Sequence, residues 1–197
     1  MNKNLKDYNN KKNTKKFNKL LSYLTISIML LAGTSIQAQA NNEKLYENMG
    51  EKIVQFQENI RVDTESINIL GIALNIKDKY NSKYTGLSQT VAINEKLFPK
   101  KMVDNYNQKP INNWKGDVTV AAAATGPSKK ENSSFTITYK NVSKISCPKL
   151  ISNLESNFSE ISVNNKIVKN DRNIFNIKET NNICNTTNSN KIAFTSF

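Results

Sequence analysis

The residues of this chain that could do covalent chemistry are two cysteines, Cys147 and Cys184. An even number of cysteines in an exported protein typically forms disulfides, and this pair would enclose 36 residues. The chain-entropy model gives a loop of that length roughly 4 kcal/mol of stabilisation. The alternative is two unpaired thiols. Whether the two cysteines form a disulfide or stay as thiols depends on whether the chain leaves the cytoplasm.

The chain has few residues suited to acid–base catalysis or to metal binding. The chain has no histidine, which removes the commonest general base and a common metal ligand. The cysteines do not have metal-ligand spacing, and no paired carboxylates or nucleophile elbow stand out. A Ser–Lys dyad stays open, because both residues are plentiful. We predict no enzyme, no cofactor and no metal site.

The N-terminus has the layout of a secretory signal peptide. A basic region covers residues 1–19, an apolar run follows at 20–32, and the segment ends in Gln37-Ala38-Gln39-Ala40. Signal peptidase requires small side chains at −3 and −1, which Ala38 and Ala40 supply. A permanent span needs about 20 apolar residues, so cleavage is favoured, although inner-membrane anchoring by residues 20–36 stays open. Either outcome exports the remainder, which favours the disulfide.

The charge does not indicate a nucleic-acid partner. The first 40 residues hold seven lysines and one aspartate, a net +6, and the other 157 hold 21 basic and 15 acidic residues, also +6. Half of the formal +12 therefore lies in the segment that export would remove. The remainder has no basic run interleaved with aromatic residues, so we predict no nucleic-acid binding.

A long helix is predicted for residues 43–79, which must position the rest of the fold. Apolar residues recur there at steps of 3, 4 or 7, namely Leu45, Met49, Ile53, Phe56, Ile60, Ile67, Leu70 and Leu74. We expect this face to pack against a sheet, with Leu70 and Leu74 in the core. The opposite face, which includes Glu58, is expected to be solvated. Residues 61–64 are the weakest stretch and suggest a kink or break.

Strand patterns dominate the rest of the chain. Strands are predicted at residues 117–124, 134–139 and 191–197, and a hairpin joins 161–163 to 166–168 over Asn164-Asn165. Pro148 marks a helix start. The predicted class is α+β, with a long N-terminal helix on an antiparallel sheet and a disulfide-closed C-terminal region. Residues 1–40 form the signal peptide or anchor. Residues 41–197 form one domain, with the helix at 41–81 and an α/β head at 82–197.

Six segments in this order carry a resemblance to a known family. They are Tyr84-Thr85-Gly86-Leu87, Val91-Ala92-Ile93-Asn94 with Phe98-Pro99, Asn112-Asn113-Trp114-Lys115-Gly116-Asp117-Val118, Phe135-Thr136-Ile137-Thr138-Tyr139, Cys147-Pro148-Lys149-Leu150, and Cys184 with the last strand. Over residues 65–197 the chain resembles type IVb pilins, most closely the major pilins of conjugative thin pili and, more distantly, the toxin-coregulated pilin. The resemblance implies a structural subunit or pilin-like component of an extracellular type IV pilus, used for attachment or conjugation.

The same resemblance implies partners and a location. The partners would be other pilin subunits, the pilus assembly machinery and a host or recipient cell surface. The protein would sit in the inner membrane before assembly and afterwards in an extracellular pilus or in the periplasm.

The N-terminus departs from the family pattern. Prepilins have a glycine before the cleavage point and then an apolar helix with glutamate at its fifth position, whereas Gly33 and Gly50 precede polar residues. The stem at residues 41–60 carries Glu43, Glu47, Glu51 and Glu58, which are costly to bury unpaired. Two hypotheses follow. The protein is either a pilus subunit or a soluble secreted binding protein or adhesin built on a pilin head. The mature N-terminus would discriminate between them.

Overall fold

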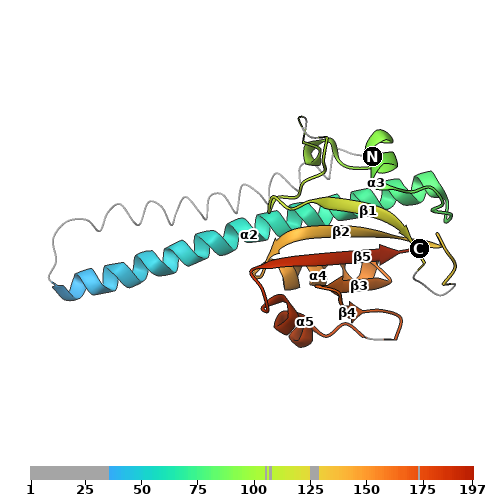
Figure 1. The fold of residues 1–197 in the computed structure, drawn as a ribbon. Coiled ribbons are helices and arrows are strands. Elements are labelled where there is room, and N and C mark those ends of the chain that lie inside the picture. Colours follow the sequence, from blue (N-terminus) through green and yellow to red (C-terminus); the bar gives the residue numbers. More distant parts are fainter. Residues whose placement is uncertain (1–35, 105, 107, 125–128, 173) are drawn as a thin grey trace, which may run out of the picture. The chain divides into compact units, whose positions relative to one another are not determined.

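The computed structural model describes residues 36–197 apart from 105, 107, 125–128 and 173, and for residues 36–44 it describes the backbone alone. The helical elements are α2 (Ile36–Tyr80), α3 (Gln89–Asn94), η1 (Lys100–Met102), α4 (Cys147–Leu154), η2 (Glu155–Asn157) and α5 (Ile177–Cys184). The strands are β1 (Val118–Ala123), β2 (Ser134–Ser143), β3 (Glu160–Val163), β4 (Lys166–Lys169) and β5 (Ser189–Ser196). Figure 1 labels the principal elements.

Contacts divide the chain into two units, Met1–Gly50 and Glu51–Phe197. The second unit contains all five strands and the part of α2 that follows Gly50. The description below concerns this second unit, which we call the head from here on; unlike the head expected at residues 82–197, it includes α2 from Glu51 onward.

The head is built on a five-stranded antiparallel sheet in the order β1-β2-β5-β3-β4. The C-terminal strand β5 therefore lies at the centre, between β2 and β3 (Figure 1). Phe194 on β5 faces Ile137 on β2 and Ile161 on β3, and all three side chains are fully buried. The last strand thus holds the two halves of the sheet together.

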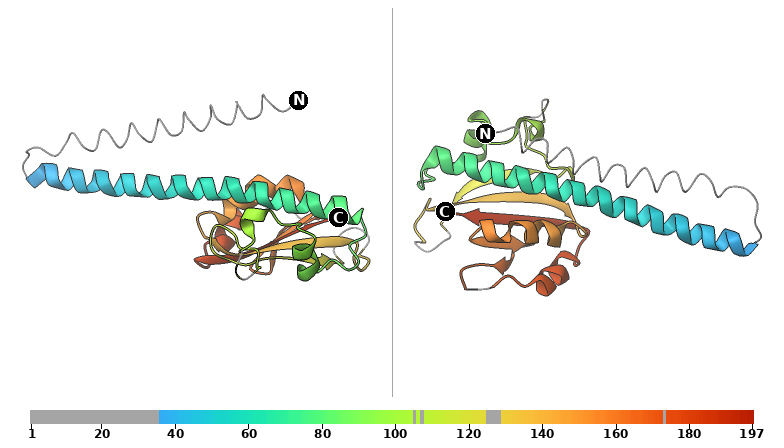
Figure 2. Two further views of the ribbon diagram at one scale, coloured as in Figure 1. Left: turned by 90° about the horizontal axis from the view of Figure 1, so that it is seen from above. Right: turned by 180° about the vertical axis from the view of Figure 1, so that it is seen from behind.

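Helices cover one face of this sheet. Within the head, α2 runs beside α4, and side-chain hydrogen bonds join them from Lys149 to Asn59 and from Asn153 to Ser66 (Figure 2). Two ring contacts extend the core, Tyr84 with Phe135 and Phe158 with Phe194. The predicted α+β class, with a long helix on an antiparallel sheet, is confirmed.

Local signals predicted the β3–β4 hairpin and the start of α4. Asn164 and Asn165 both have positive φ, at 51° and 68°, as a two-residue hairpin turn requires. Pro148 lies in the first turn of α4. The helix α5 was not predicted, because its Asn-rich sequence lacks a strong apolar period. The expected break at residues 61–64 is wrong, since α2 continues through them and Val62 is buried there.

Candidate assembly surface

The part of α2 in the head has two apolar faces. The inner face packs on the core through buried side chains, namely Val62, Ile69, Ile72, Ala73 and Ile76. These positions follow steps of 7, 3, 1 and 3, which place them on one side of a helix. This face attaches α2 to the sheet.

The outer face of α2 is apolar as well. Its residues are Ile53, Phe56, Ile60, Ile67, Leu70 and Leu74, a set that we call the outer seam. Four of them recur every seven residues and are exposed, Ile53 by 42%, Ile60 by 48%, Ile67 by 70% and Leu74 by 60%. A seven-residue apolar period is the pattern of helices that pack along one another in a left-handed supercoil.

The sequence prediction for the facing of α2 is therefore wrong in part. Leu74 was expected in the core and is exposed. Leu70 is half-buried and packs against the edge of the core. The face that was expected to be solvated holds Glu58, which is only 7% exposed. The reason is that two glutamates on the inner face find hydrogen-bond donors in the head, so burying that face does not leave them unpaired.

Glu58 is the first of these buried carboxylates. Its Oε2 accepts hydrogen bonds from Trp114 Nε1 at 3.0 Å, from Ser143 Oγ at 2.9 Å and from Ser146 Oγ. Its Oε1 lies 2.5 Å from Nη1 of Arg61. Burial alone would raise the pKa of Glu58, but the hydrogen bonds from Ser146, Trp114 and Ser143 and the charge of Arg61 lower it below its ordinary value.

Glu65 is the second carboxylate, two turns further along the inner face. It accepts hydrogen bonds from Tyr139 OH at 3.0 Å, from Asn113 N at 2.8 Å and from Asn68 Nδ2 at 3.1 Å. Burial, together with the charge and hydrogen bond of Glu65, raises the pKa of Tyr139 well above its ordinary value. The phenol is therefore held neutral as a donor, and α2 is fixed to β2 at this point.

The loop at residues 112–116 supplies donors to both carboxylates, and its own shape is fixed by side chains. Asn112 Oδ1 accepts from the backbone N–H groups of Trp114 and Gly116, at 2.9 and 3.0 Å. A Cβ at Gly116 would lie 1.9 Å from the carbonyl oxygen of Lys140. Asn141 also donates to the carbonyl of Trp114. The sequence identified this loop as a family motif. It did not predict that the loop donates hydrogen bonds to Glu58 and Glu65.

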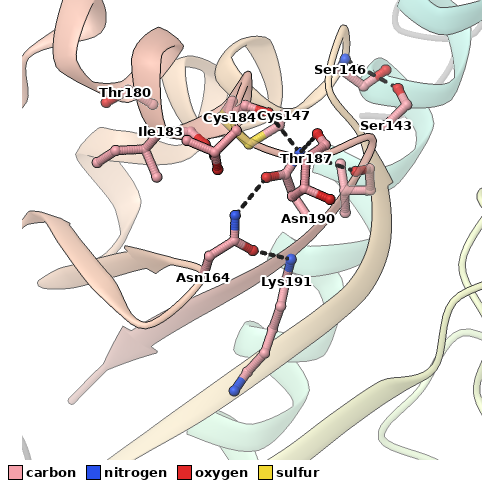
Figure 3. The surroundings of a disulfide bond; sticks show 12 residues. Ser143, Ser146, Cys147, Asn164, Thr180, Ile183, Cys184, Thr187, Asn190 and Lys191 are labelled. Atoms are coloured by element: carbon pink, nitrogen blue, oxygen red, sulfur yellow. Dashed lines mark hydrogen bonds between the residues drawn. A yellow bond between two sulfur atoms is a disulfide. The ribbon is translucent and has the colours of Figure 1, made fainter.

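The disulfide Cys147–Cys184 forms as predicted, and both cysteines are fully buried. Figure 3 shows how the bond joins the start of α4 to the end of α5. Asn190 on β5 donates to the carbonyl of Cys184 at 3.0 Å and accepts from Asn164 Nδ2 at 2.8 Å. Asn164 in turn accepts from the backbone N–H of Lys191. The disulfide, the hairpin and the central strand therefore form one hydrogen-bonded cluster.

The predicted export signal lies outside the residues whose side chains are described. Residues 1–35 are not described, and Ala38 and Ala40 fall in the part of α2 for which only the backbone is described. Signal cleavage after Ala40, and anchoring by residues 20–36, remain predictions. Among the described residues, no helix combines the length and hydrophobicity of a membrane span.

Comparisons with known proteins find chains of similar fold among solved structures. A comparison with curated protein sequences gave no match. Among solved structures, the chain is similar to a type IVb pilin from Salmonella typhi, with 20% identity, a TM-score of 0.52 and coverage of 67% of this chain and 97% of that one. It is also similar to TcpA, a type IV pilin from Vibrio cholerae El Tor biotype, with 12% identity, a TM-score of 0.52 and coverage of 70% and 99%.

The family comparison covers most of the head. The model described as PilS N terminal matches residues 59–197, more than half of the chain. The match begins next to Glu58, takes in Glu65 and the loop at residues 112–116, and includes both cysteines. The chain therefore belongs to the PilS family and has the fold of the type IVb pilins.

Proposed function

We propose that the protein is a structural subunit of an extracellular type IV pilus that serves attachment or conjugation, and that the outer seam of α2 contacts other subunits. The observation that carries the proposal is the seam itself. Four large aliphatic side chains, spaced by seven residues, are 42–70% exposed on a helix whose other face is buried against the head between Glu58 and Ile76. Apolar patches of this kind on a soluble head mark interaction surfaces.

Membership of the PilS family and the type IVb pilin fold support the same proposal. The partners would be other copies of the chain and the assembly machinery, with the inner membrane as the site of the protein before assembly. A host or recipient cell surface would be contacted by the finished fibre. In this proposal the polar stem does not prevent apolar packing, because the seam lies on the side of α2 away from Glu58.

The experiment compares the filament yield of a variant altered in the seam with that of a variant altered at exposed apolar residues elsewhere. The variant Ile60→Lys/Ile67→Lys should fold, judged by circular dichroism and by the intact disulfide, but should give no sheared surface filaments in electron micrographs. The matched control is Ile145→Lys/Ile167→Lys, whose side chains are 51% and 44% exposed and lie outside α2. The control should give wild-type yield. Normal filaments from the seam variant would reject the surface.

A soluble secreted binding protein is the second candidate, and the stem favours it. Glu47 and Glu51 are exposed on α2, and Ala38 and Ala40 fit signal peptidase. N-terminal sequencing of the exported protein separates the two candidates. A mature chain that begins at Asn41, with no filaments in any fraction, would support the soluble protein. A retained apolar segment at residues 20–31 together with filaments would support the pilus subunit.

A further inference from the structure

The outer seam is interrupted by two residues of opposite charge. Ile53, Ile60, Ile67 and Leu74 occupy one heptad position, called a here, and Phe56, Asp63, Leu70 and Lys77 occupy the position three residues later, called d. Asp63 is exposed and Lys77 is half-buried. Neither of them forms an ion pair within the described residues. Their separation is fourteen residues, or two heptads.

This spacing bears on how a second copy could pack along the seam. In a parallel pair of helices, a positions face a positions and d positions face d positions. With no stagger, Asp63 faces Asp63 and Lys77 faces Lys77, so like charges meet. With a stagger of one heptad, Asp63 faces Phe56 or Leu70, which removes water from a carboxylate without supplying a partner.

A stagger of two heptads removes the like-charge conflict and gives Asp63 of one copy a basic partner. Ile53 then faces Ile67, and Phe56 faces Leu70. Ile60 faces Leu74, and Asp63 faces Lys77. In an antiparallel pair, by contrast, d positions face a positions, so Asp63 meets an aliphatic side chain in every register. The parallel arrangement with a fourteen-residue stagger is the one that matches apolar with apolar and acid with base.

We propose, building on the assembly role proposed above, that the outer seam binds the outer seam of a second copy in parallel, shifted by fourteen residues, with Asp63 of one copy paired with Lys77 of the next. At 1.5 Å per residue the shift is about 21 Å along the helix. Residues 53–63 of one copy then engage residues 67–77 of the next, so the two copies use different parts of the same seam. Such a head-to-tail contact does not close on itself and generates an open fibre.

A charge swap tests the pair. The single changes Asp63→Lys and Lys77→Asp each place like charges opposite one another, and each should lower filament yield at least about tenfold. The double variant Asp63→Lys/Lys77→Asp should restore the yield to within about twofold, because the opposite charges meet again. The control Glu51→Lys makes the same charge change at an exposed residue on the other side of α2 and should leave the yield unchanged.

Cross-linking tests the stagger. In filaments of the variant Ile60→Cys/Leu74→Cys, a short bifunctional thiol reagent should link position 60 of one copy to position 74 of the next and give a ladder of multimers. The variant Ile60→Cys alone should give none, since equivalent positions lie about 21 Å apart. Dimers from Ile60→Cys alone, or a double charge swap that stays defective, would overturn the stagger. If the wild-type chain forms no filaments, the proposed function fails instead.

Discussion

The indole Nε1 of Trp114 lies 3.0 Å from Oε2 of Glu58, across 56 positions of the sequence. The only tryptophan of the chain is thereby tied to a carboxylate on the inner face of α2. Ser143 and Ser146 donate to the same oxygen. This relationship fixes the helix, the loop at residues 112–116 and the start of α4 to one another.

Replacing Glu58 by alanine should therefore destabilise the head by roughly 2–4 kcal/mol, since it leaves several buried donors without an acceptor. The measurement is urea unfolding followed by tryptophan fluorescence. Glu51→Ala, at an exposed position seven residues earlier, is the matched control and should stay within about 0.5 kcal/mol of wild type. Equal midpoints for the two variants would contradict the burial of Glu58.

The free energy of unfolding of the head should also fall at acid pH, because Glu58 becomes protonated. Its pKa in the folded head is lowered from the ordinary value of 4.5, so its contribution is complete above that value and is lost as the pH falls through the folded pKa. Glu160 acts in the opposite sense, because burial and the charge of Asp171 raise its pKa. The contribution of Glu58 is isolated by comparing wild type with Glu58→Gln between pH 7 and acid. The difference in unfolding free energy between them should shrink as the pH falls.

Side-chain truncation should destabilise the subunit on one face of α2 and have little effect on the other. Ile72 is fully buried, and Ile72→Ala should cost roughly 2–5 kcal/mol, because a cavity remains in the core. Leu74 is 60% exposed, and Leu74→Ala should change the stability of the isolated subunit by no more than about 0.5 kcal/mol. Thermal unfolding of the subunit measures both. A large loss for Leu74→Ala alone would mean that its face is covered within the subunit.

The disulfide should contribute strongly to stability. The variant Cys147→Ser/Cys184→Ser opens a loop between residues 37 positions apart and should lose about 2–5 kcal/mol. Unreduced digestion and mass spectrometry should show one cross-linked peptide in the wild type. Recovery of both cysteines as free thiols from the exported fraction would contradict the bond.

Gly116 should tolerate no side chain. Gly116→Ala places a Cβ 1.9 Å from the carbonyl oxygen of Lys140, so the backbone must move, at a cost of about 1–3 kcal/mol or more. The control is Gly71→Ala on α2, where a Cβ meets nothing within 4 Å. This substitution should raise the free energy of unfolding by about 0.5–1 kcal/mol, because alanine favours a helix more than glycine does. Equal melting temperatures for the two variants would show that the loop is free to shift.

The sequence by itself determined the features that depend on neighbouring residues or on residue type. The pair Asn164-Asn165 specifies a hairpin turn because both residues accept positive φ. Pro148 specifies a helix start, since its missing N–H costs nothing there. The alternation at residues 134–139 specifies a strand with one buried face. Two cysteines in a chain predicted to be exported favoured the disulfide, because each has a single possible partner within the chain.

The tertiary structure alone decided which face of α2 turns inward. The helix is apolar on both sides, so its periodicity cannot distinguish the core face from the outer seam. The choice depends on donors that lie far along the chain, since Ser146 is 88 positions from Glu58 and Tyr139 is 74 from Glu65. Carboxylates that would oppose burial on an isolated helix become anchors once these donors surround them. The face without such donors is the one left exposed.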